Sequence, residues 1–343
     1  MLSVFTANGF LRLALFALVL LTASCGGGGG GGVPVPPPDE EPAPAPGDEP
    51  APDPGETPAS PSAVLSVVLV DYPHQIDVYA TTGATRAVVF LHGGGGRNYR
   101  SAYELGVNLI DAPPTTASAN WTWLEANKVL AVFPQGQALP QGSRTWNNHV
   151  MDSGEDDVGF LQALAGYVQS EHGISDIYLA GHSNGGMMAN RIWCESPTSY
   201  QAYIALAGPA SDYYSTTTPC APAVVRPYLG IVGELDNVLQ VEGNWEALTW
   251  TINPFLVALT PVSFVNPVLI GEWVQHQARA RAMCGENPVL GDKTSDGVVE
   301  SWRNCSGRVQ LHRSLSGGHS FDSLEAETGY RMIDIVAEFI GGI

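Results

Sequence analysis

Positively charged residues are scarce in this sequence. Its 343 residues include 15 lysines and arginines against 34 aspartates and glutamates, which gives a formal net charge of −19 at pH 7. A chain of this charge repels nucleic acid, and no basic stripe interrupts the acidic balance. We therefore exclude nucleic acid as a partner.

Hydrophobic runs long enough to cross a membrane are also missing. The apolar run Leu13 to Leu21 is too short to span a bilayer comfortably. It follows Arg12 and precedes Thr22-Ala23-Ser24-Cys25, so residues 1–24 have the three parts of a secretory signal peptide. The ending resembles a bacterial lipobox, which predicts that Cys25 is lipidated and holds an exported lipoprotein at the outer membrane or cell surface. Cleavage near the same point, followed by free secretion, is the alternative.

Cysteine pairs with metal-ligand spacing are absent, since the chain has no C-x-x-C, and we expect no metal site. Besides Cys25, the sequence has four cysteines, and an even number in an exported chain predicts two disulfides. Three connectivities are possible. We favour sequential pairing, Cys194 with Cys220 and Cys284 with Cys305, because it closes short loops.

The composition divides the chain into a tether and one domain. Residues 25–62 are a glycine run followed by proline, alanine and acidic residues, which cannot bury enough apolar area to fold. Residues 63–343 have about the size of a single α/β domain, large enough for a substantial core. We expect this domain to be monomeric.

A nucleophile elbow is predicted in the middle of the domain. The run Ile177 to Leu179 leads into a G-x-S-x-G turn in which Gly181 and Gly185 flank Ser183, and a helix-like segment follows. In this turn, glycines let a strand reverse sharply into a helix and expose the serine hydroxyl. Ser183 is the candidate nucleophile and the backbone N–H of Asn184 a candidate oxyanion donor. The alternative is a glycine-serine turn with a solvated hydroxyl.

A glycine loop follows an earlier strand. Arg86 to Leu91 is a continuous apolar run typical of a buried parallel strand, and it ends in His92-Gly93-Gly94-Gly95-Gly96. Loops of this type supply the second oxyanion donor in α/β-hydrolases, because glycine lets a backbone N–H approach the substrate carbonyl. Gly94 is the first choice of donor and Gly93 the second, against the alternative of a merely flexible loop.

The candidate acid and base follow in the order that this fold requires. Asp236 comes just after the strand-like run Tyr228 to Val232, with Glu234 as its competitor, and His319 lies on a glycine-flanked loop before the last helix. The chain order serine, acid, histidine is that of α/β-hydrolases. His319 would take the proton of Ser183, and Asp236 would orient the imidazole, so the predicted chemistry is acyl transfer without a cofactor.

The remaining pattern predicts an α/β-hydrolase fold, with a mostly parallel central sheet flanked by helices. Asp156 and Asp157 stand in the first turn of an amphipathic helix, so we assign them a structural role. The segment Asn244 to Trp273 is apolar and rich in tryptophan. It is either a lid or docking surface over the active site or a part of the core. Further elements are expected at Val64–Asp71, Gln75–Ala80, Trp121–Ala126, Val129–Phe133, Tyr203–Leu206, Val309–Leu315 and Ala326–Ile340.

Taken together, these motifs resemble the polyhydroxybutyrate depolymerase-like esterases, an α/β-hydrolase group that includes feruloyl and acetyl-xylan esterases. The matching residues span nearly all of the domain: Leu91–Gly96, Phe133-Pro134-Gln135-Gly136, Trp146-Asn147, Asp156–Phe160, Gly181–Met188, Gly233–Asp236 and Gly317-Gly318-His319. The resemblance implies an exported serine carboxylic ester hydrolase. Trp146, Asn147 and Phe321 are its expected substrate-binding residues.

Departures from that family's pattern affect the substrate. Phe133 and Gln135 replace a tyrosine and an aspartate that are common there, and Ser320-Phe321 replaces a tryptophan-proline pair. The apolar insertion favours a polyhydroxybutyrate-type polyester over a feruloylated or acetylated polysaccharide. A protein of another class, a non-catalytic surface binding protein on a hydrolase scaffold, and a peptidase are the remaining alternatives.

Overall fold

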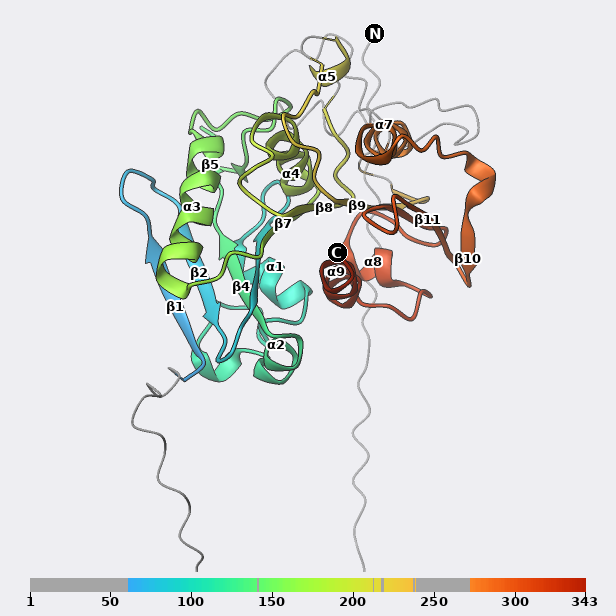
Figure 1. Ribbon diagram of the computed structural model, residues 1–343. Coiled ribbons are helices and arrows are strands. Elements are labelled where there is room, and N and C mark those ends of the chain that lie inside the picture. The colour runs from blue at the N-terminus through green and yellow to red at the C-terminus, as the bar shows by residue number, and fades with distance from the viewer. Residues whose placement is uncertain (1–60, 141, 212, 217–218, 237, 239–271) are drawn as a thin grey trace, which may run out of the picture. The chain divides into compact units, whose positions relative to one another are not determined.

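The computed structural model describes residues 61–140, 142–211, 213–216, 219–236, 238 and 272–343 (Figure 1). These residues belong to one compact unit, Thr57–Ile343. The expected signal peptide, Cys25, nearly all of the tether and all but the last two residues of the apolar segment 244–273 lie outside the described residues. In the described part, no helix is long and apolar enough to cross a membrane.

A ten-stranded sheet forms the centre of the domain. Its order is β1-β2-β4-β3-β7-β8-β9-β12-β11-β10, and the six strands from β4 to β12 in this order are parallel, while the outer strands are antiparallel. The strands are β1 (Ala63–Val68), β2 (Gln75–Ala80), β3 (Arg86–Leu91), β4 (Val129–Pro134), β7 (Ile177–His182), β8 (Ala202–Leu206), β9 (Tyr228–Gly233), β10 (Thr294–Asp296), β11 (Val299–Asn304) and β12 (Val309–Ser314). A small separate hairpin joins β5 (Gln137–Ala138) and β6 (Arg144–Thr145).

Helices cover both faces of the sheet, which explains why the central strands are continuous apolar runs. One face packs against α3 (Asp157–His172), α4 (Asn184–Glu195) and α7 (Glu272–Cys284), and the other against α1 (Asn98–Glu104), α2 (Trp121–Asn127), α8 (Phe321–Glu325) and α9 (Met332–Gly341), as Figure 1 shows. The short elements η1 (Thr116–Ser118), α5 (Tyr213–Thr216) and η2 (Leu290–Asp292) lie in the connections. The mostly parallel sheet between helices is the predicted fold class.

The sequence misplaced the start of the last helix. The expected helix Ala326 to Ile340 begins only at Met332, and a separate short helix, α8, precedes it. Glu327 and Gly329 between the two helices have positive φ angles of 61° and 73°, which a right-handed helix cannot contain. At the other end of the chain, β1 stops at Val68 rather than Asp71, because Asp71 has a φ of 72°.

Two disulfides fasten one side of the domain. Cys194 at the end of α4 is bonded to Cys220, and Cys284 at the end of α7 is bonded to Cys305 after β11. This is the sequential pairing that we predicted because it closes short loops. Disulfides persist in oxidising compartments, so they indicate an extracellular or periplasmic protein.

Trp273, the last residue of the apolar segment, lies in the core of the domain. It is 2% exposed and packs with Trp302, Val232 and Leu311 in a cluster between α7 and the sheet. At this residue the core alternative therefore holds, and Trp273 is not available to a lid.

Candidate active site

The predicted elbow joins β7 to α4. Ser183 has φ 52° and ψ −119°, a conformation that is unfavourable for a residue with a side chain and is typical of functional positions. A β-carbon on Gly181 would lie 2.3 Å from the carbonyl of Gly185, and one on Gly185 would lie 2.3 Å from the carbonyl oxygen of Leu91. Both positions therefore require glycine, and the turn holds Ser183 at the carboxyl end of β7.

Ser183, His319 and Asp236 form a continuous chain of hydrogen bonds. The Oγ of Ser183 lies 2.8 Å from Nε2 of His319, and Nδ1 of His319 lies 2.7 Å from Oδ2 of Asp236. A carboxylate only accepts, so Nδ1 carries the proton and Nε2 is the acceptor for the serine hydroxyl. The three residues meet because β7, β9 and β12 are parallel and end at one edge of the sheet.

Glu234, the competing acid, has another partner. Its Oε2 lies 2.6 Å from Nε of Arg313 on β12. Asp236, two residues further along, also accepts the backbone N–H of Val238 at 2.9 Å, which fixes the carboxylate toward His319. Of the two candidates, the geometry therefore selects Asp236.

The glycine loop and the elbow each contribute a backbone N–H beside the cavity at Ser183. The loop turns between Gly93 and Gly96, whose N–H donates to the Gly93 carbonyl at 3.0 Å. A β-carbon on Gly94 would lie 3.7 Å from Cβ of Asn184, so the two residues are neighbours across the site. In the described part of the chain the N–H of Gly94 has no acceptor, and that of Asn184 is the first of α4, where no intrahelical acceptor exists. Both can therefore bind a developing oxyanion.

His92 holds the glycine loop in place from below. Its Nδ1–H donates to the carbonyl of Gly93 at 2.7 Å, and its Nε2 accepts the backbone N–H of Gly136 at 2.9 Å. Burial, together with the charges of Arg144 and Arg97 and against the hydrogen bond to Gly93, lowers the pKa of His92 to about 4. His92 is therefore neutral near pH 7 and held in a single tautomer.

His182 connects the elbow to the histidine loop. Its Nε2–H donates to the backbone carbonyl of His319 at 2.6 Å. Burial, followed by the neighbouring charge on His319, lowers the pKa of His182 to about 4. The residue next to the nucleophile thus stays neutral and positions the backbone of the base.

Trp146 and Phe321 do not have the expected contact with substrate. Trp146 is 0% exposed, donates its indole N–H to the carbonyl of His92 at 3.0 Å, and donates its backbone N–H to Oδ1 of Asn184 at 2.8 Å. Phe321 is 2% exposed and packs against His182, with ring centroids 4.5 Å apart. Neither side chain lines the cavity at Ser183, so we correct both assignments: these residues support the site from behind.

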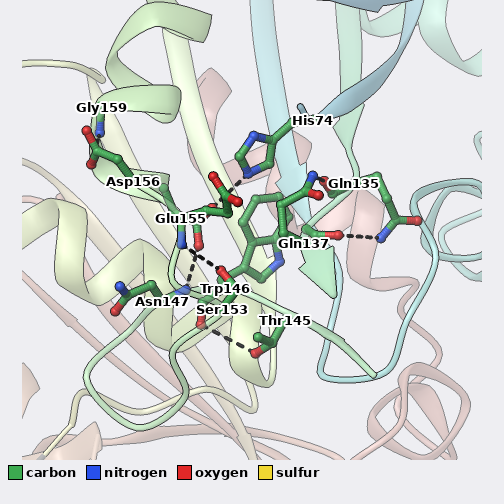
Figure 2. A network of polar contacts seen from close by, with 12 residues as sticks. His74, Gln135, Gln137, Thr145, Trp146, Asn147, Ser153, Glu155, Asp156 and Gly159 are labelled. Atoms are coloured by element: carbon green, nitrogen blue, oxygen red, sulfur yellow. Dashed lines mark hydrogen bonds and ion pairs between the residues drawn. The ribbon is translucent and has the colours of Figure 1, made fainter. Parts of the chain in front are cut away.

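Asn147 also belongs to this supporting layer, shown in Figure 2. Its backbone N–H donates to Oδ2 of Asp157 at 2.6 Å, and Oδ1 of Asp157 lies 2.8 Å from Nε2 of His74. The His74 ring stacks on Phe160 at 3.8 Å between centroids, and the nearly parallel Trp146 ring lies 6.0 Å from His74 and 6.5 Å from Phe160. Asn147 is thus a structural residue and not a substrate contact. The predicted structural role of Asp157 extends beyond the helix terminus, because it fixes the loop that carries Trp146.

A cavity of about 530 Å³ opens at Ser183 and His319. Its apolar wall consists of Leu139, Val150, Met151 and Met187, and its polar wall, beyond the glycine loop, includes Arg97, Arg100 and Glu104. This volume is in the range typical of small-molecule sites. The cavity can hold a short ester with the carbonyl next to both N–H donors.

The sequence did not identify most of the cavity wall, and Met151 and Arg97 are two examples. The sulfur of Met151 accepts the side-chain amide of Asn184 at 3.2 Å, and no periodic pattern marks this methionine. Arg97 directly follows the glycine loop. This position, at the end of the loop that contains the predicted oxyanion donor Gly94, could have identified Arg97 from the sequence.

Comparisons with known proteins bear on the fold. No protein-family model and no curated protein sequence matches the chain. Among solved structures, the acetyl xylan esterase from Aspergillus awamori is 14% identical, with 82% of this chain and 99% of that chain covered and a TM-score of 0.51. An α/β serine hydrolase from Xanthomonas campestris is 13% identical, with 82% and 94% covered and a TM-score of 0.41. The carboxylesterase EstE1 from a metagenomic library is 13% identical, with 84% and 90% covered and a TM-score of 0.45. The chain therefore has the fold of the α/β-hydrolases.

Proposed function

We propose that this protein is an exported serine carboxylic ester hydrolase. The observation that carries the proposal is the hydrogen-bonded chain Ser183–His319–Asp236 at a cavity that also receives the N–H groups of Gly94 and Asn184. Ser183 and His319 both line the cavity, so the serine end of this chain is accessible to a bound ester.

Each group has a defined role in the proposed reaction. Ser183 attacks the ester carbonyl while its proton passes to Nε2 of His319, and Asp236 stabilises the imidazolium that forms. Gly94 and Asn184 bind the negatively charged carbonyl oxygen, each donor contributing about 3 kcal/mol of barrier lowering. The alcohol leaves with the proton from His319. Water then attacks the acyl-enzyme, with His319 again as the base, and releases the acid and Ser183.

We propose a short hydroxyacyl polyester or oligoester, of the polyhydroxybutyrate type, as the substrate. The motifs shared with the depolymerase-like esterases and the apolar wall of the cavity support this choice. Acetyl-xylan esters are the second candidate, which the name of the Aspergillus awamori structure and the limited cavity volume favour. Feruloyl esters remain a third candidate on the resemblance alone.

We further propose that residues 63–343 are the catalytic domain, tethered by residues 25–62 to a lipid on Cys25. The composition of the tether and the lipobox-like ending support this arrangement. Mass spectrometry of the N-terminal peptide from the native producer would show a diacylated or triacylated cysteine, whereas a free N-terminus near the same position would indicate secretion.

The function is tested with purified protein on poly(3-hydroxybutyrate) film, p-nitrophenyl butyrate, acetylated xylan and methyl ferulate in parallel. We expect Ser183→Ala to lower kcat/KM by at least about 10⁴-fold on every ester that the wild type cleaves. Film clearing that is lost in the variant supports the polyester substrate, and acetate release without clearing supports the second candidate. Activity that survives Ser183→Ala contradicts the mechanism, and failure of a serine-reactive phosphonate to label Ser183 would favour a binding protein.

Asp236→Asn and Glu234→Gln form a matched pair for the acid. We expect Asp236→Asn to lower kcat by about 10⁴-fold, because the imidazole loses its orienting carboxylate. Glu234→Gln removes the same charge from a partly buried pair with Arg313, which keeps Glu300 as a second carboxylate, so we expect kcat to stay within about threefold of the wild type. Equal losses in the two variants would contradict the assignment of Asp236.

A further inference from the structure

One positive charge on the cavity wall lacks a counter-ion. Arg97 lines the same cavity as Ser183 and His319, and its side chain is exposed there. In the described part of the chain it has neither an ion pair nor a side-chain hydrogen bond. Its charge is therefore available to an anionic ligand that enters the cavity.

The other charged side chains that the structure describes on this wall are paired. The Nε of Arg100 lies 3.0 Å from Oε1 of Glu104, and its Nη1 lies 2.9 Å from Oδ2 of Asp111. Arg100 therefore has two carboxylates within hydrogen-bond distance, and Glu104 already has its cation. Among the described residues of this wall, Arg97 is thus the cation whose hydrogen-bond donors remain open to a ligand.

The place of Arg97 in the chain relates this charge to the reacting bond. Arg97 is three residues from Gly94, whose N–H faces the site of the developing oxyanion, and the turn between them is closed by the hydrogen bond from Gly96 to Gly93. A ligand whose ester carbonyl is bound by Gly94 therefore reaches Arg97 within the same cavity of about 530 Å³. A guanidinium is the side chain best suited to bind a carboxylate through two parallel hydrogen bonds.

We propose that Arg97 binds a carboxylate on the substrate, a short distance from the ester that Ser183 attacks. This inference rests on the proposed function and narrows its substrate to anionic esters. A hydroxyacyl oligoester has such a carboxylate at its free acid end, so the enzyme would cleave ester bonds near that end and prefer soluble oligomers over the interior of a polymer. A uronic acid beside an esterified sugar offers the same chemistry.

Binding to the inactive Ser183→Ala protein tests the proposal without turnover. Calorimetry compares the linear trimer of 3-hydroxybutyrate as the free acid with its methyl ester, which differ only in the negative charge. We expect the acid to bind about tenfold more tightly, the effect of one charge-assisted contact. Raising the salt from 0.05 to 0.5 M should narrow this difference, because the site is open to solvent.

Arg97→Gln and Arg281→Gln, each introduced into Ser183→Ala, are the matched variants. Arg281 is exposed on α7, does not line the cavity, and carries the same charge. We expect the preference for the acid to disappear in Arg97→Gln and to persist in Arg281→Gln. A preference that survives Arg97→Gln would overturn the proposal, and so would equal binding of the charged and uncharged ligands both in this pair and in the xylo-oligosaccharide pair described next.

Two further experiments show which kind of ligand supplies the carboxylate and whether the protein is an esterase at all. In the first, acetylated xylo-oligosaccharides with and without a glucuronic acid branch replace the trimer acid and its methyl ester. Tighter binding of the glucuronic acid ligand alone, lost in Arg97→Gln, would support the carboxylate site and assign it to a polysaccharide. Wild-type hydrolysis of p-nitrophenyl butyrate is measured separately. Hydrolysis with equal binding of acids and esters would support the esterase activity and contradict the Arg97 site. Tighter binding of acids without any hydrolysis would contradict only the esterase activity.

Discussion

His92 shows how one buried imidazole fixes the glycine loop that carries a proposed oxyanion donor. It donates to Gly93 and accepts from Gly136, so both ring nitrogens are used and the loop above them has one conformation. A residue that acts in this way changes the rate through the N–H of Gly94 and not through contact with the substrate. His92 is therefore a positioning residue.

We expect His92→Ala to lower kcat by about 10- to 100-fold with little change in KM, because the loop loses its fixed conformation but the cavity remains. His92→Asn keeps a donor near the position of Nδ1 and should recover part of the loss. Steady-state kinetics on p-nitrophenyl butyrate measure both effects. An equal rise of KM in the two variants, with kcat unchanged, would show that His92 shapes the binding cavity and not the oxyanion hole.

The site shows which residues a sequence can and cannot identify. Ser183, Asp236 and His319 were predictable because each lies in a short motif at the end of a strand, in the order of the fold. Trp146 and Phe321 were misassigned because adjacency to a motif does not reveal burial. An indole that donates to a backbone carbonyl behind the loop has the same sequence signature as one that faces the substrate.

At the scale of elements, α7 is attached to the elbow helix through buried charges. The Arg279 guanidinium lies 3.4 Å above the ring of Tyr228, and its Nη2 donates to Oδ1 of Asn190 on α4. Nη1 of Arg279 lies 3.6 Å from Oε2 of Glu272, and burial raises the pKa of Glu272 to about 7 against the attraction of Arg279. Asn190 in turn donates to the carbonyls of Gly186 and Gly208, so the cluster reaches the base of the elbow.

Because Arg279 and Glu272 are both buried, replacing one of them should lower the free energy of unfolding more than replacing both. We expect Arg279→Met to lower the free energy of unfolding by about 3 to 5 kcal/mol, since Glu272 is left buried beside an apolar side chain. The double variant Arg279→Met, Glu272→Gln should be less destabilised than Arg279→Met alone. Urea unfolding of the wild type, both single variants and the double variant measures the coupling. Additive losses would contradict a coupled pair.

The elements differ in how strongly the sequence specified them. Arg86 to Leu91 and Tyr228 to Val232 were predictable because strands covered on both faces are continuous apolar runs. The β10–β11 hairpin at the sheet edge was missed, because Thr294–Asp296 is polar and fully exposed and gives no apolar signal. The last helix was misplaced because the interruption at Glu327 depends on a backbone conformation that its residue type does not require.

At the scale of the whole molecule, several buried histidines resist protonation. Burial, together with the charges of Arg303 and His276, lowers the pKa of His312 to about 4. Unfolded, His312 would bind a proton below about pH 6.5. Between pH 6.5 and about 4, the proton therefore binds the unfolded chain in preference, and folding stability falls as the pH falls through this window.

The comparison of wild type with His312→Gln isolates this contribution. The raised pKa values of Asp77, about 6, and Glu272, about 7, act in the opposite direction, but they are common to both proteins and cancel. We expect the wild type to lose up to about 1.4 kcal/mol per pH unit relative to the variant between pH 6.5 and 4. Urea midpoints at pH 7, 6, 5 and 4.5 measure the difference, and parallel pH profiles would contradict it.

The position of β12 in the sheet makes the candidate triad depend on the C-terminal part of the chain. Among the described strands, β12 is the last parallel one in the sequence, yet it lies between β9 and β11, and His319 follows it. The strand and helix that hold Ser183 come much earlier in the chain. A chain shortened before β12 would therefore keep Ser183 but lack the imidazole that accepts its proton.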